Sequence, residues 1–268
     1  MHGRVLVIAG SDSGGGAGVQ ADLKTVTALG AFAATAITAV TVQDTNGVSG
    51  IHAIPPEIIA AQIRVVLKDL GADAIKTGML ASVPVIEIVM ATLADCANTI
   101  PLVVDPVMVA KGGASLLERD AVNALIKNVL PKAILITPNL PEAEALTGRN
   151  INSAQSMREA VKHLRDLGPT AVLLKGGHLP GEDLIDIYSG PEGTQEWRSV
   201  RIATRHTHGT GCTLASAIAT GFAQSMSAID SISRARAFVR TAITTAPGLG
   251  QGHGPLNHAH TVRQFTER

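Results

Sequence analysis

A glycine-rich segment around residue 210 has the composition of an anion-binding turn. Gly209 and Gly211 flank Thr210, and a run of small residues that predicts a helix follows at once. Glycines let the backbone turn tightly, so that successive amide N–H groups and the positive end of the helix dipole converge on one anion. The segment therefore predicts a cradle for a phosphoryl group in transfer. A glycine-rich turn that only redirects the chain would have the same composition, so that alternative stays open.

Cys212 follows this turn and lies in the first turn of the expected helix. There the helix dipole would stabilise a thiolate, so the pKa of the thiol is expected to fall below its usual value. A base or a nucleophile is chemically plausible at such a position. The competing interpretation is a small buried cysteine that packs as a hydrophobe.

Carboxylates follow two of the expected strands. Glu142 lies in the first turn of a helix that comes directly after the strand at 134–136, with Asn139 close by, and Asp105 ends another strand. Carboxylate and amide oxygens suit Mg²⁺ and its water shell, so these residues predict a metal site. Stabilisation of the helix dipole by Glu142 and capping of a turn by Asp105 would explain the same residues.

Another expected strand ends in a cation, Lys175, which is followed by Gly176 and Gly177. The lysine ammonium is a point charge that suits the phosphates of a nucleotide. A solvated lysine at a strand end is the commoner situation. The residue types alone leave both interpretations open.

Two segments near the N-terminus are suited to hold the molecule that accepts the phosphoryl group. Residues 9–22 form a glycine-rich connection, but the acid that a dinucleotide-binding motif requires about twenty residues later is absent from 33–42. Flexible backbone that approaches a substrate is the better interpretation. Gln43 ends the second strand with an amide that could recognise a heteroaromatic ring through a donor and an acceptor. A buried glutamine satisfied by backbone groups is the alternative.

The composition points to a small-molecule partner. Twenty-two basic residues balance twenty-two acidic ones, and aromatic residues make up 2% of the chain. The charge balance and the lack of aromatic stacking surfaces disfavour nucleic acid and membrane surfaces as partners. Two cysteines, Cys96 and Cys212, do not make a disulfide framework, and no apolar run approaches the roughly 18 residues of a membrane span. We therefore expect a cytoplasmic protein.

Short β-branched runs alternate with longer amphipathic runs along all 268 residues. This alternation predicts an α/β fold in which helices cover both faces of a mostly parallel sheet. The expected strands are 5–9, 37–42, 74–77, 102–105, 134–137 and 171–175. The expected helices are 18–29, 56–70, 84–97, 118–130, 153–167, 213–224 and 228–245. Two further strand-like pieces, 184–188 and 197–202, surround a turn at 190–193 and predict an antiparallel edge hairpin. No linker or repeat suggests a boundary, so a single domain spanning 1–268 is expected.

Taken in order, the motifs resemble the ribokinase-like superfamily and, within it, the hydroxymethylpyrimidine and hydroxymethylpyrimidine-phosphate kinases. The matching segments run nearly end to end: AGSDSGGGAGVQADLKT, TAVTVQDTNGV, IKTGML, VVDPVM, LITPNLPEAEALTG, LLKGGH, THGTGCTLASAIA and GHGPLNH. The resemblance implies a three-layer α/β/α sandwich without a separate lid domain, and a homodimer. The turn at 46–50 and the glycines at 14–16 look too short to form a lid.

The resemblance also implies an activity and a role for each matching residue. The activity is ATP-dependent phosphorylation of 4-amino-5-hydroxymethyl-2-methylpyrimidine and of its monophosphate in thiamine biosynthesis. The pyrimidine pocket would comprise Gln43, Ala9, Gly10, Asp12, Val42 and Met79. Gly209, Thr210 and Gly211 would form the anion hole, and Cys212 stands where many ribokinase-like enzymes have a catalytic aspartate. Mg²⁺ would be organised by Asp105 and Glu142, and ATP by Asn139, Lys175, Thr137 and Gly176. A monovalent cation is a further candidate.

Three alternatives remain at this stage. A pyridoxal kinase of the same fold would phosphorylate a ring that also bears a hydroxymethyl group. A nucleotide-binding relative without catalysis would keep the fold alone. Loop histidines could instead ligate zinc, although their spacing matches no zinc motif; the candidates are His206, His208, His253, His258 and His260.

Overall fold

The computed structural model describes residues 1–110, 113–114 and 116–263. Its centre is one nine-stranded sheet with the strand order β3-β2-β1-β4-β5-β6-β7-β8-β9. The strands are β1 (Arg4–Asp12), β2 (Phe32–Gln43), β3 (Val48–Ala53), β4 (Ala74–Thr77), β5 (Leu102–Val104), β6 (Leu135–Ile136), β7 (Val172–Lys175), β8 (Asp183–Gly190) and β9 (Gly193–Val200). The neighbours from β2 to β7 are parallel, whereas β3, β8 and β9 run antiparallel to their neighbours.

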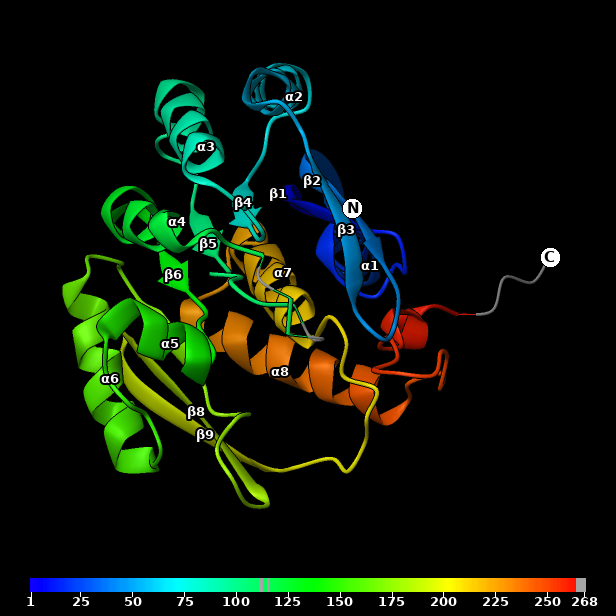
Figure 1. Cartoon of the computed structure of the whole chain (residues 1–268), viewed down its shortest axis with the longest axis vertical. Helices are drawn as coiled ribbons and strands as arrows, with labels where there is room; N and C mark the ends of the chain where they lie inside the picture. The colour runs from blue at the N-terminus through cyan, green and yellow to red at the C-terminus, as the bar shows by residue number, and fades with distance from the viewer. Residues whose placement is uncertain (111–112, 115, 264–268) are drawn as a thin grey trace.

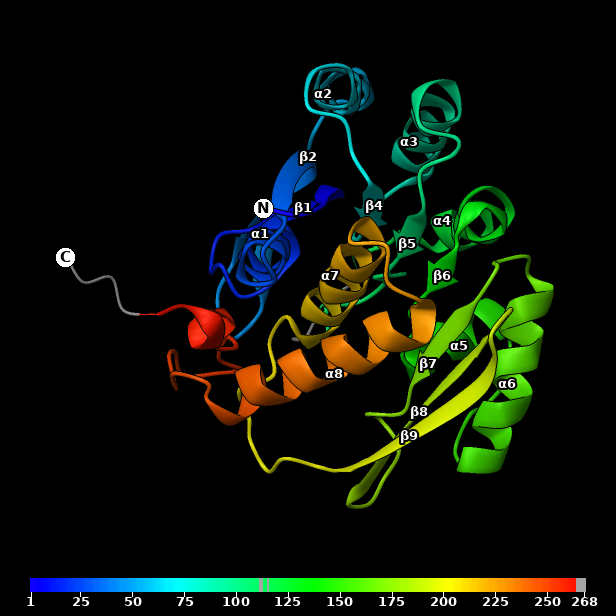
Figure 2. The ribbon, with the colours of Figure 1, turned by 180° about the vertical axis from the view of Figure 1, so that it is seen from behind.

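Helices cover both faces of the sheet (Figures 1 and 2). The helices are α1 (Gly18–Ala28), α2 (Pro56–Asp69), α3 (Val83–Cys96), α4 (Arg119–Ala124), α5 (Leu140–Thr147), α6 (Ala154–Asp166), α7 (Thr210–Ala223) and α8 (Ala228–Thr244). A π-helical turn and two 3₁₀ turns add Leu125–Val129, Leu130–Lys132 and His258–Thr261. Within the described residues, no helix has both the length and the apolar composition needed to cross a membrane.

Two apolar cores lie on opposite faces of the sheet because strand side chains alternate. Leu6 and Ile8 of β1 join one core with α2 to α6, whereas Val5 and Val7 join the other with α1, α7 and α8. The central strands are therefore buried on both sides, as parallel strands with helices on each face require. This arrangement is the three-layer α/β/α sandwich that the sequence predicts.

Most expected elements are confirmed, with differences at the edges of the sheet. The hairpin of β8 and β9 is present, but β9 begins at Gly193 and not at 197. The sequence did not predict β3, which pairs with β2 and begins at Val48 inside the expected turn at 46–50. The expected helix at 118–130 is α4, followed by the π-helical and 3₁₀ turns.

The parallel strands bring their carboxyl ends to one edge of the sheet, where open α/β sheets bind ligands. β1 ends at Asp12, β2 at Gln43 and β7 at Lys175. Asp105 directly follows β5, and Gly209 is the N-cap residue of α7. Segments that lie far apart in the sequence therefore deliver polar groups to one place.

Candidate active site

A cavity of about 1340 Å³ opens at this edge of the sheet. Most of the residues singled out in the sequence line it: Ala9, Gly10, Asp12, Gln43, Met79, Asp105, Asn139, Glu142, Lys175, Gly209, Thr210, Gly211 and Cys212. Val42, Thr137 and Gly176 do not. The Val42 side chain is 63% exposed, because alternation along β2 turns it away from the face that carries Thr41 and Gln43.

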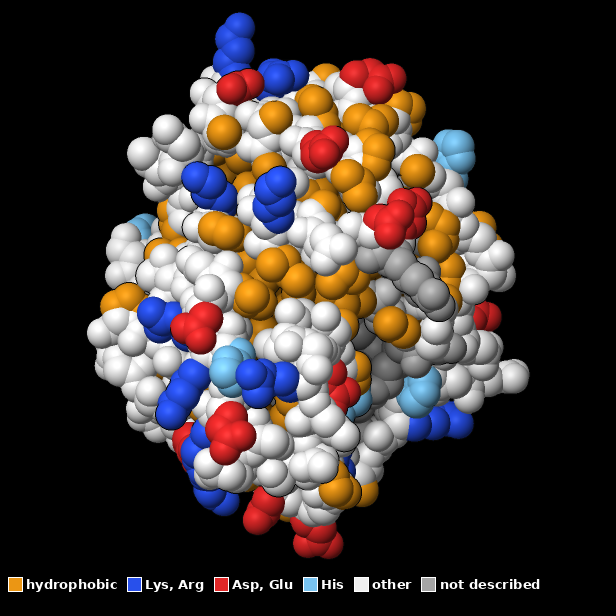
Figure 3. All heavy atoms as spheres, turned by 60° about the vertical axis from the view of Figure 1, so that its left-hand side comes forward, with side chains coloured by type: hydrophobic (Ala, Val, Ile, Leu, Met, Phe, Trp, Pro, Cys, Tyr) orange, Lys and Arg blue, Asp and Glu red, His pale blue; other side chains and the backbone are white. Residues whose placement is uncertain are grey.

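Part of the cavity wall is apolar and comes from the segment after β5, including Val107, Met108 and Leu116. In Figure 3, hydrophobic side chains gather near the middle of the visible face. Basic and acidic side chains are interspersed around them, without an extended patch of one sign. The visible face thus lacks the basic stripe that binding of nucleic acid would require.

The glycine turn before α7 has the backbone shape that anion binding needs. Gly209 has a φ of 81°, and a side chain on it would collide with the carbonyl of Gly16. In the described part of the chain no side chain caps α7, so the amides at its start face the cavity without a protein cap. The N–H of Thr210 donates to the Thr207 carbonyl at 3.3 Å. The amides of Gly211 and Cys212 are therefore the better candidates for contact with an anion.

The pKa expected for Cys212 was wrong. Burial raises the pKa of the thiol to about 12, although the charge of Lys76 and the N–H of Gly18 act in the opposite direction. Loss of water around a thiolate outweighs the dipole of one helix terminus here. Cys212 thus carries a proton at neutral pH in the protein without its ligands.

Lys175 and Asp105 form a pair beside the glycine turn. Lys175 Nζ lies 3.2 Å from Asp105 Oδ1, which also accepts the hydroxyl of Thr137 at 3.2 Å. A Cβ atom added to Gly211 would lie 3.4 Å from Lys175 Nζ, so this ammonium borders the start of α7. Burial lowers the pKa of Lys175, but the charges of Asp105 and Glu142 outweigh it and raise the pKa. Lys175 is therefore a fixed positive charge and not a solvated strand-end lysine.

Glu142 and Asn139 form a capping box at the start of α5. The N–H of Asn139 donates to Glu142 Oε2 at 2.8 Å, and the N–H of Glu142 donates to Asn139 Oδ1 at 2.9 Å. Burial raises the pKa of Glu142 to about 7; the charge of Lys175 lowers it and that of Asp105 raises it further. Two carboxylates that disfavour each other's charge form a donor set that suits a divalent cation. Capping uses only one carboxylate oxygen of Glu142, so both the structural and the metal-binding interpretation fit.

A buried ion pair that the sequence reasoning missed supports the floor of the cavity. Lys76 Nζ on β4 lies 2.8 Å from Asp22 Oδ2 on α1, and both side chains are 0% exposed. Ser216 on α7 donates its hydroxyl to Asp22 at 2.6 Å. Burial lowers the pKa of Lys76, but the charge of Asp22 outweighs it and keeps the ammonium protonated. The sequence could have indicated this ion pair, because a lysine inside a short, otherwise uncharged strand needs a buried partner.

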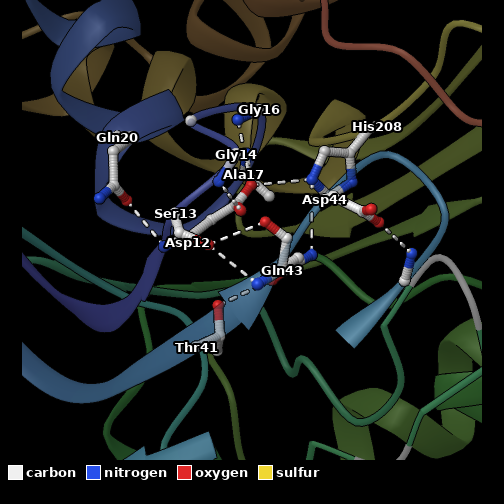
Figure 4. A network of polar contacts seen from close by, with 12 residues as sticks. Asp12, Ser13, Gly14, Gly16, Ala17, Gln20, Thr41, Gln43, Asp44 and His208 are labelled. Atoms are coloured by element: carbon white, nitrogen blue, oxygen red, sulfur yellow. Dashed lines mark hydrogen bonds and ion pairs between the residues drawn. The ribbon is translucent and has the colours of Figure 1, made fainter. Parts of the chain in front are cut away.

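His208, which the sequence suggested only as a possible zinc ligand, instead joins Asp12 to Gln43 (Figure 4). Asp12 points into the glycine loop and accepts the N–H groups of Gly14, Gly16 and Ala17 at 2.8–3.0 Å. Asp12 therefore holds the loop that borders the pocket. The sequence signal was a histidine directly before the glycine turn.

The five loop histidines do not assemble into a metal site. His208 contacts Asp12, and His258 contacts Thr213. His253 contacts the Arg205 carbonyl, and His260 packs on Phe238. The described residues contain no group of three or more potential side-chain ligands from histidine, cysteine, aspartate and glutamate. The zinc interpretation is therefore not supported.

Comparison with known proteins gives one consistent family. The phosphomethylpyrimidine kinase family profile matches residues 12–257. The hydroxymethylpyrimidine/phosphomethylpyrimidine kinase of Rhizobium meliloti is 46% identical over 97% of this chain and 98% of that protein. The thiamine biosynthesis bifunctional protein ThiED of Geobacter sulfurreducens is 50% identical, and the chain spans 54% of its length.

A solved structure gives the same fold. The pyridoxal kinase from Staphylococcus aureus in complex with AMP-PCP and pyridoxal superimposes with a TM-score of 0.89. It is 34% identical, and the match covers 98% of this chain and 96% of that one. The ribokinase-like fold is therefore confirmed. From the family match and the identity to its members over nearly the whole sequence, the chain belongs to the phosphomethylpyrimidine kinase family.

Proposed function

We propose that this protein transfers the terminal phosphoryl group of ATP to 4-amino-5-hydroxymethyl-2-methylpyrimidine and then to its monophosphate, in thiamine biosynthesis. The observation that carries the proposal is the position of three features on one cavity: Gln43, Cys212 and the turn at 209–211. The amide at 43 suits a ring with a donor and an acceptor. The turn suits the phosphate that this ring receives.

In the proposed reaction the thiol of Cys212 gives its proton to solvent as the ligands bind. The hydroxymethyl oxygen then attacks the terminal phosphorus of ATP, the bond from that phosphorus to the ADP oxygen breaks, and the Cys212 thiolate accepts the hydroxyl proton. The amides at the start of α7 and the ammonium of Lys175 stabilise the negative charge of the phosphoryl group. Catalysis of this kind depends mainly on positioning and electrostatics. Cys212 is protonated before ligands bind, and the positive charge of Lys76 lowers the cost of forming the thiolate.

Mg²⁺ belongs to this proposal, and Asp105 and Glu142 would hold it together with its water shell. The ion would neutralise charge on the ATP phosphates. The raised pKa of Glu142, which is caused by burial and by the nearby Asp105 carboxylate, supports a cation between these groups. Asn139 and Lys175 would contact the ATP phosphates from the same side of the cavity. Thr137 and Gly176 would act indirectly, because the Thr137 hydroxyl donates to Asp105 and the Gly176 N–H donates to Asp186, two carboxylates that line the cavity.

Phosphorylation of pyridoxal is the second candidate, because a pyridoxal kinase superimposes on the chain over almost its whole length. The two functions are separated by an ADP-release assay with the pyrimidine, its monophosphate and pyridoxal. We expect kcat/KM to be highest for the two pyrimidines. A preference for pyridoxal would replace the proposal with the second candidate. ATP binding without ADP release for any of the three would identify a non-catalytic relative.

The remaining parts of the proposal concern organisation. The continuous sheet and its two cores support a single domain over 1–268.

Val40 and Val42 lie on one face of β2 and are 43% and 63% exposed, which supports pairing with a second copy there. The free thiols of Cys96 and Cys212 support a reducing, cytoplasmic location.

A further inference from the structure

His208 is a buried side chain at the junction of three segments, and the proposed reaction does not yet use it. It is 6% exposed. Its Nε2 atom lies 2.8 Å from Asp12 Oδ2 at the end of β1 and 3.5 Å from the Gln43 amide at the end of β2 (Figure 4). The next residue along the chain, Gly209, begins the glycine turn.

The partners of Asp12 determine which atom of His208 carries a proton. Asp12 accepts three backbone N–H groups, from Gly14, Gly16 and Ala17. Burial raises the pKa of Asp12, but the hydrogen bonds from His208 and from these amides outweigh it and lower the pKa. At neutral pH the carboxylate is therefore ionised and can only accept. The short contact then requires His208 Nε2 to donate an N–H.

The two ends of the Gln43 amide can now be distinguished. They have nearly the same shape, so hydrogen bonds decide which end is oxygen and which is nitrogen. With the amide nitrogen of Gln43 toward His208, that nitrogen lies 3.5 Å from His208 Nε2. Both nitrogens would then carry hydrogens, so two donors would face each other. The oxygen end can accept from the same N–H.

Thr41 leads to the same result from the other end of the amide. Its hydroxyl lies 2.9 Å from the Ser11 carbonyl and 3.1 Å from the Gln43 amide. A hydroxyl has one hydrogen, and the Ser11 carbonyl can only accept it. Thr41 therefore presents a lone pair to Gln43, and the amide end that faces it must be the NH₂ group.

We propose that His208, fixed by Asp12, is a positioning residue that holds the Gln43 amide with its oxygen toward His208 and its nitrogen toward Thr41. This inference rests on the proposed function, in which Gln43 recognises the acceptor ring. One N–H and one oxygen lone pair of the amide then remain for that ring. They complement a ring nitrogen next to an amino group, which an aminopyrimidine has and pyridoxal lacks. His208 thus favours aminopyrimidines over pyridoxal.

The His208 ring also packs against the glycine loop. A Cβ atom added to Gly16 would collide with the His208 ring, and one added to Gly209 would collide with the Gly16 carbonyl. The loop that Asp12 organises is thus packed directly against His208 and the start of α7.

A binding experiment tests the positioning role. Calorimetry on wild type, His208→Ala and Thr41→Val measures the Kd of the aminopyrimidine and, separately, that of AMP-PCP. We expect both variants to weaken pyrimidine binding by about tenfold, the usual effect of one lost hydrogen bond to a bound ligand, and to change the Kd of AMP-PCP by less than about twofold. His258→Ala is the matched control, because it removes another buried histidine, bonded to Thr213 at 2.9 Å, that does not contact Gln43. An equal loss of affinity for both ligands, or an equal loss of pyrimidine affinity in His258→Ala, would overturn the inference.

A second measurement does not depend on the reaction. ¹⁵N NMR of the ligand-free protein, with the His208 signals assigned by their loss in His208→Ala, reports whether Nε2 is protonated. We expect a protonated Nε2, and an unprotonated one would overturn the inference. If Nε2 is protonated but neither pyrimidine is phosphorylated, the positions of the amide ends stand and the proposed function fails. The two failures are therefore distinguishable.

Discussion

At the scale of single residues, the site combines a protonated thiol with fixed cations. Burial raises the pKa of Cys212 to about 12, while Lys76 and Lys175 supply positive charge nearby. A thiol of this kind acts as a base only after it has lost its own proton to solvent, and the nearby positive charge lowers the cost of the thiolate. This distinguishes Cys212 from the reactive cysteines that helix termini ionise in more polar surroundings.

Replacement of this thiol separates the two phosphorylation steps. We expect Cys212→Ala to lower kcat for the hydroxymethylpyrimidine by about 10²-fold, the usual effect of removing a general base, with the pyrimidine Kd nearly unchanged. The loss should be smaller for the monophosphate, because its phosphate oxygens are already largely ionised at pH 7. Steady-state assays measure both, with Cys96→Ala on the exposed end of α3 as control. Unchanged turnover would make Cys212 a packing residue.

Glu142 gives the site a pH dependence with a definite sign. Its pKa of about 7 means that the carboxylate ionises as pH rises from 6 to 8, so Mg²⁺ should bind more tightly over that interval. We expect Glu142→Gln, which keeps an oxygen for the capping box, to remove this dependence and to raise the half-saturating Mg²⁺ concentration about tenfold, a loss typical of one bond to a charged group. Glu144→Gln on the same helix is the control. Titration of activity with Mg²⁺ at several pH values provides the test, and an unchanged profile would assign Glu142 to capping alone.

Residue types and spacing identified the polar strand ends but not their partners. Gln43, Asp105, Glu142 and Lys175 could be found because each follows a short apolar run. The pairing of Lys76 with Asp22 and of His208 with Asp12 could not, because these contacts join positions 54 and 196 residues apart. The pKa of Cys212 also required the structure, since burial and not helix position decides it.

At the scale of elements, a buried ion pair and one hydroxyl connect two helices to the central sheet. Lys76 on β4 and Asp22 on α1 are bonded to each other, and Ser216 on α7 is bonded to Asp22. The helix that begins with the phosphate turn is thereby tied to the central sheet. Such a pair contributes little net stability when intact, but its disruption leaves a buried charge without compensation.

We expect Lys76→Met to lower the free energy of unfolding by about 3–5 kcal/mol, because Asp22 then remains buried without a cation. Urea denaturation measures the loss. Arg64→Met removes a cation from the exposed pair with Asp95 and serves as the matched control. Arg64→Met should lower the free energy of unfolding by less than about 1 kcal/mol. Equal effects for the two variants would contradict the role assigned to the pair.

The central elements were predictable because they are buried on both faces, which makes each strand a continuous apolar run. β3 was missed for the opposite reason. It lies at the edge of the sheet, its side chains are mostly exposed, and it contains Ser49 and Gly50, which favour a turn over a strand. β9 shares this exposure, and its start was placed four residues too late.

At the scale of the whole molecule, the β2–β3 edge supports self-association. Val40 and Val42 expose apolar surface on one face of β2. We expect sedimentation equilibrium to show a dimer at micromolar concentration and Val42→Asp to shift it toward monomer, because a buried unpaired charge would oppose association. Val65→Asp is the control, because the Val65 side chain on α2 is 62% exposed. A monomeric wild-type protein would contradict this part of the proposal.

The arrangement of the whole cavity is tested most directly by a structure of the protein with the hydroxymethylpyrimidine, AMP-PCP and Mg²⁺. The account predicts that the terminal phosphate contacts the amides of Gly211 and Cys212 at the start of α7, with the hydroxymethyl oxygen between the phosphorus and the Cys212 side chain. It also predicts a ring nitrogen and an amino group on the Gln43 amide. A terminal phosphate bound away from the start of α7, or a ring that does not contact Gln43, would contradict it.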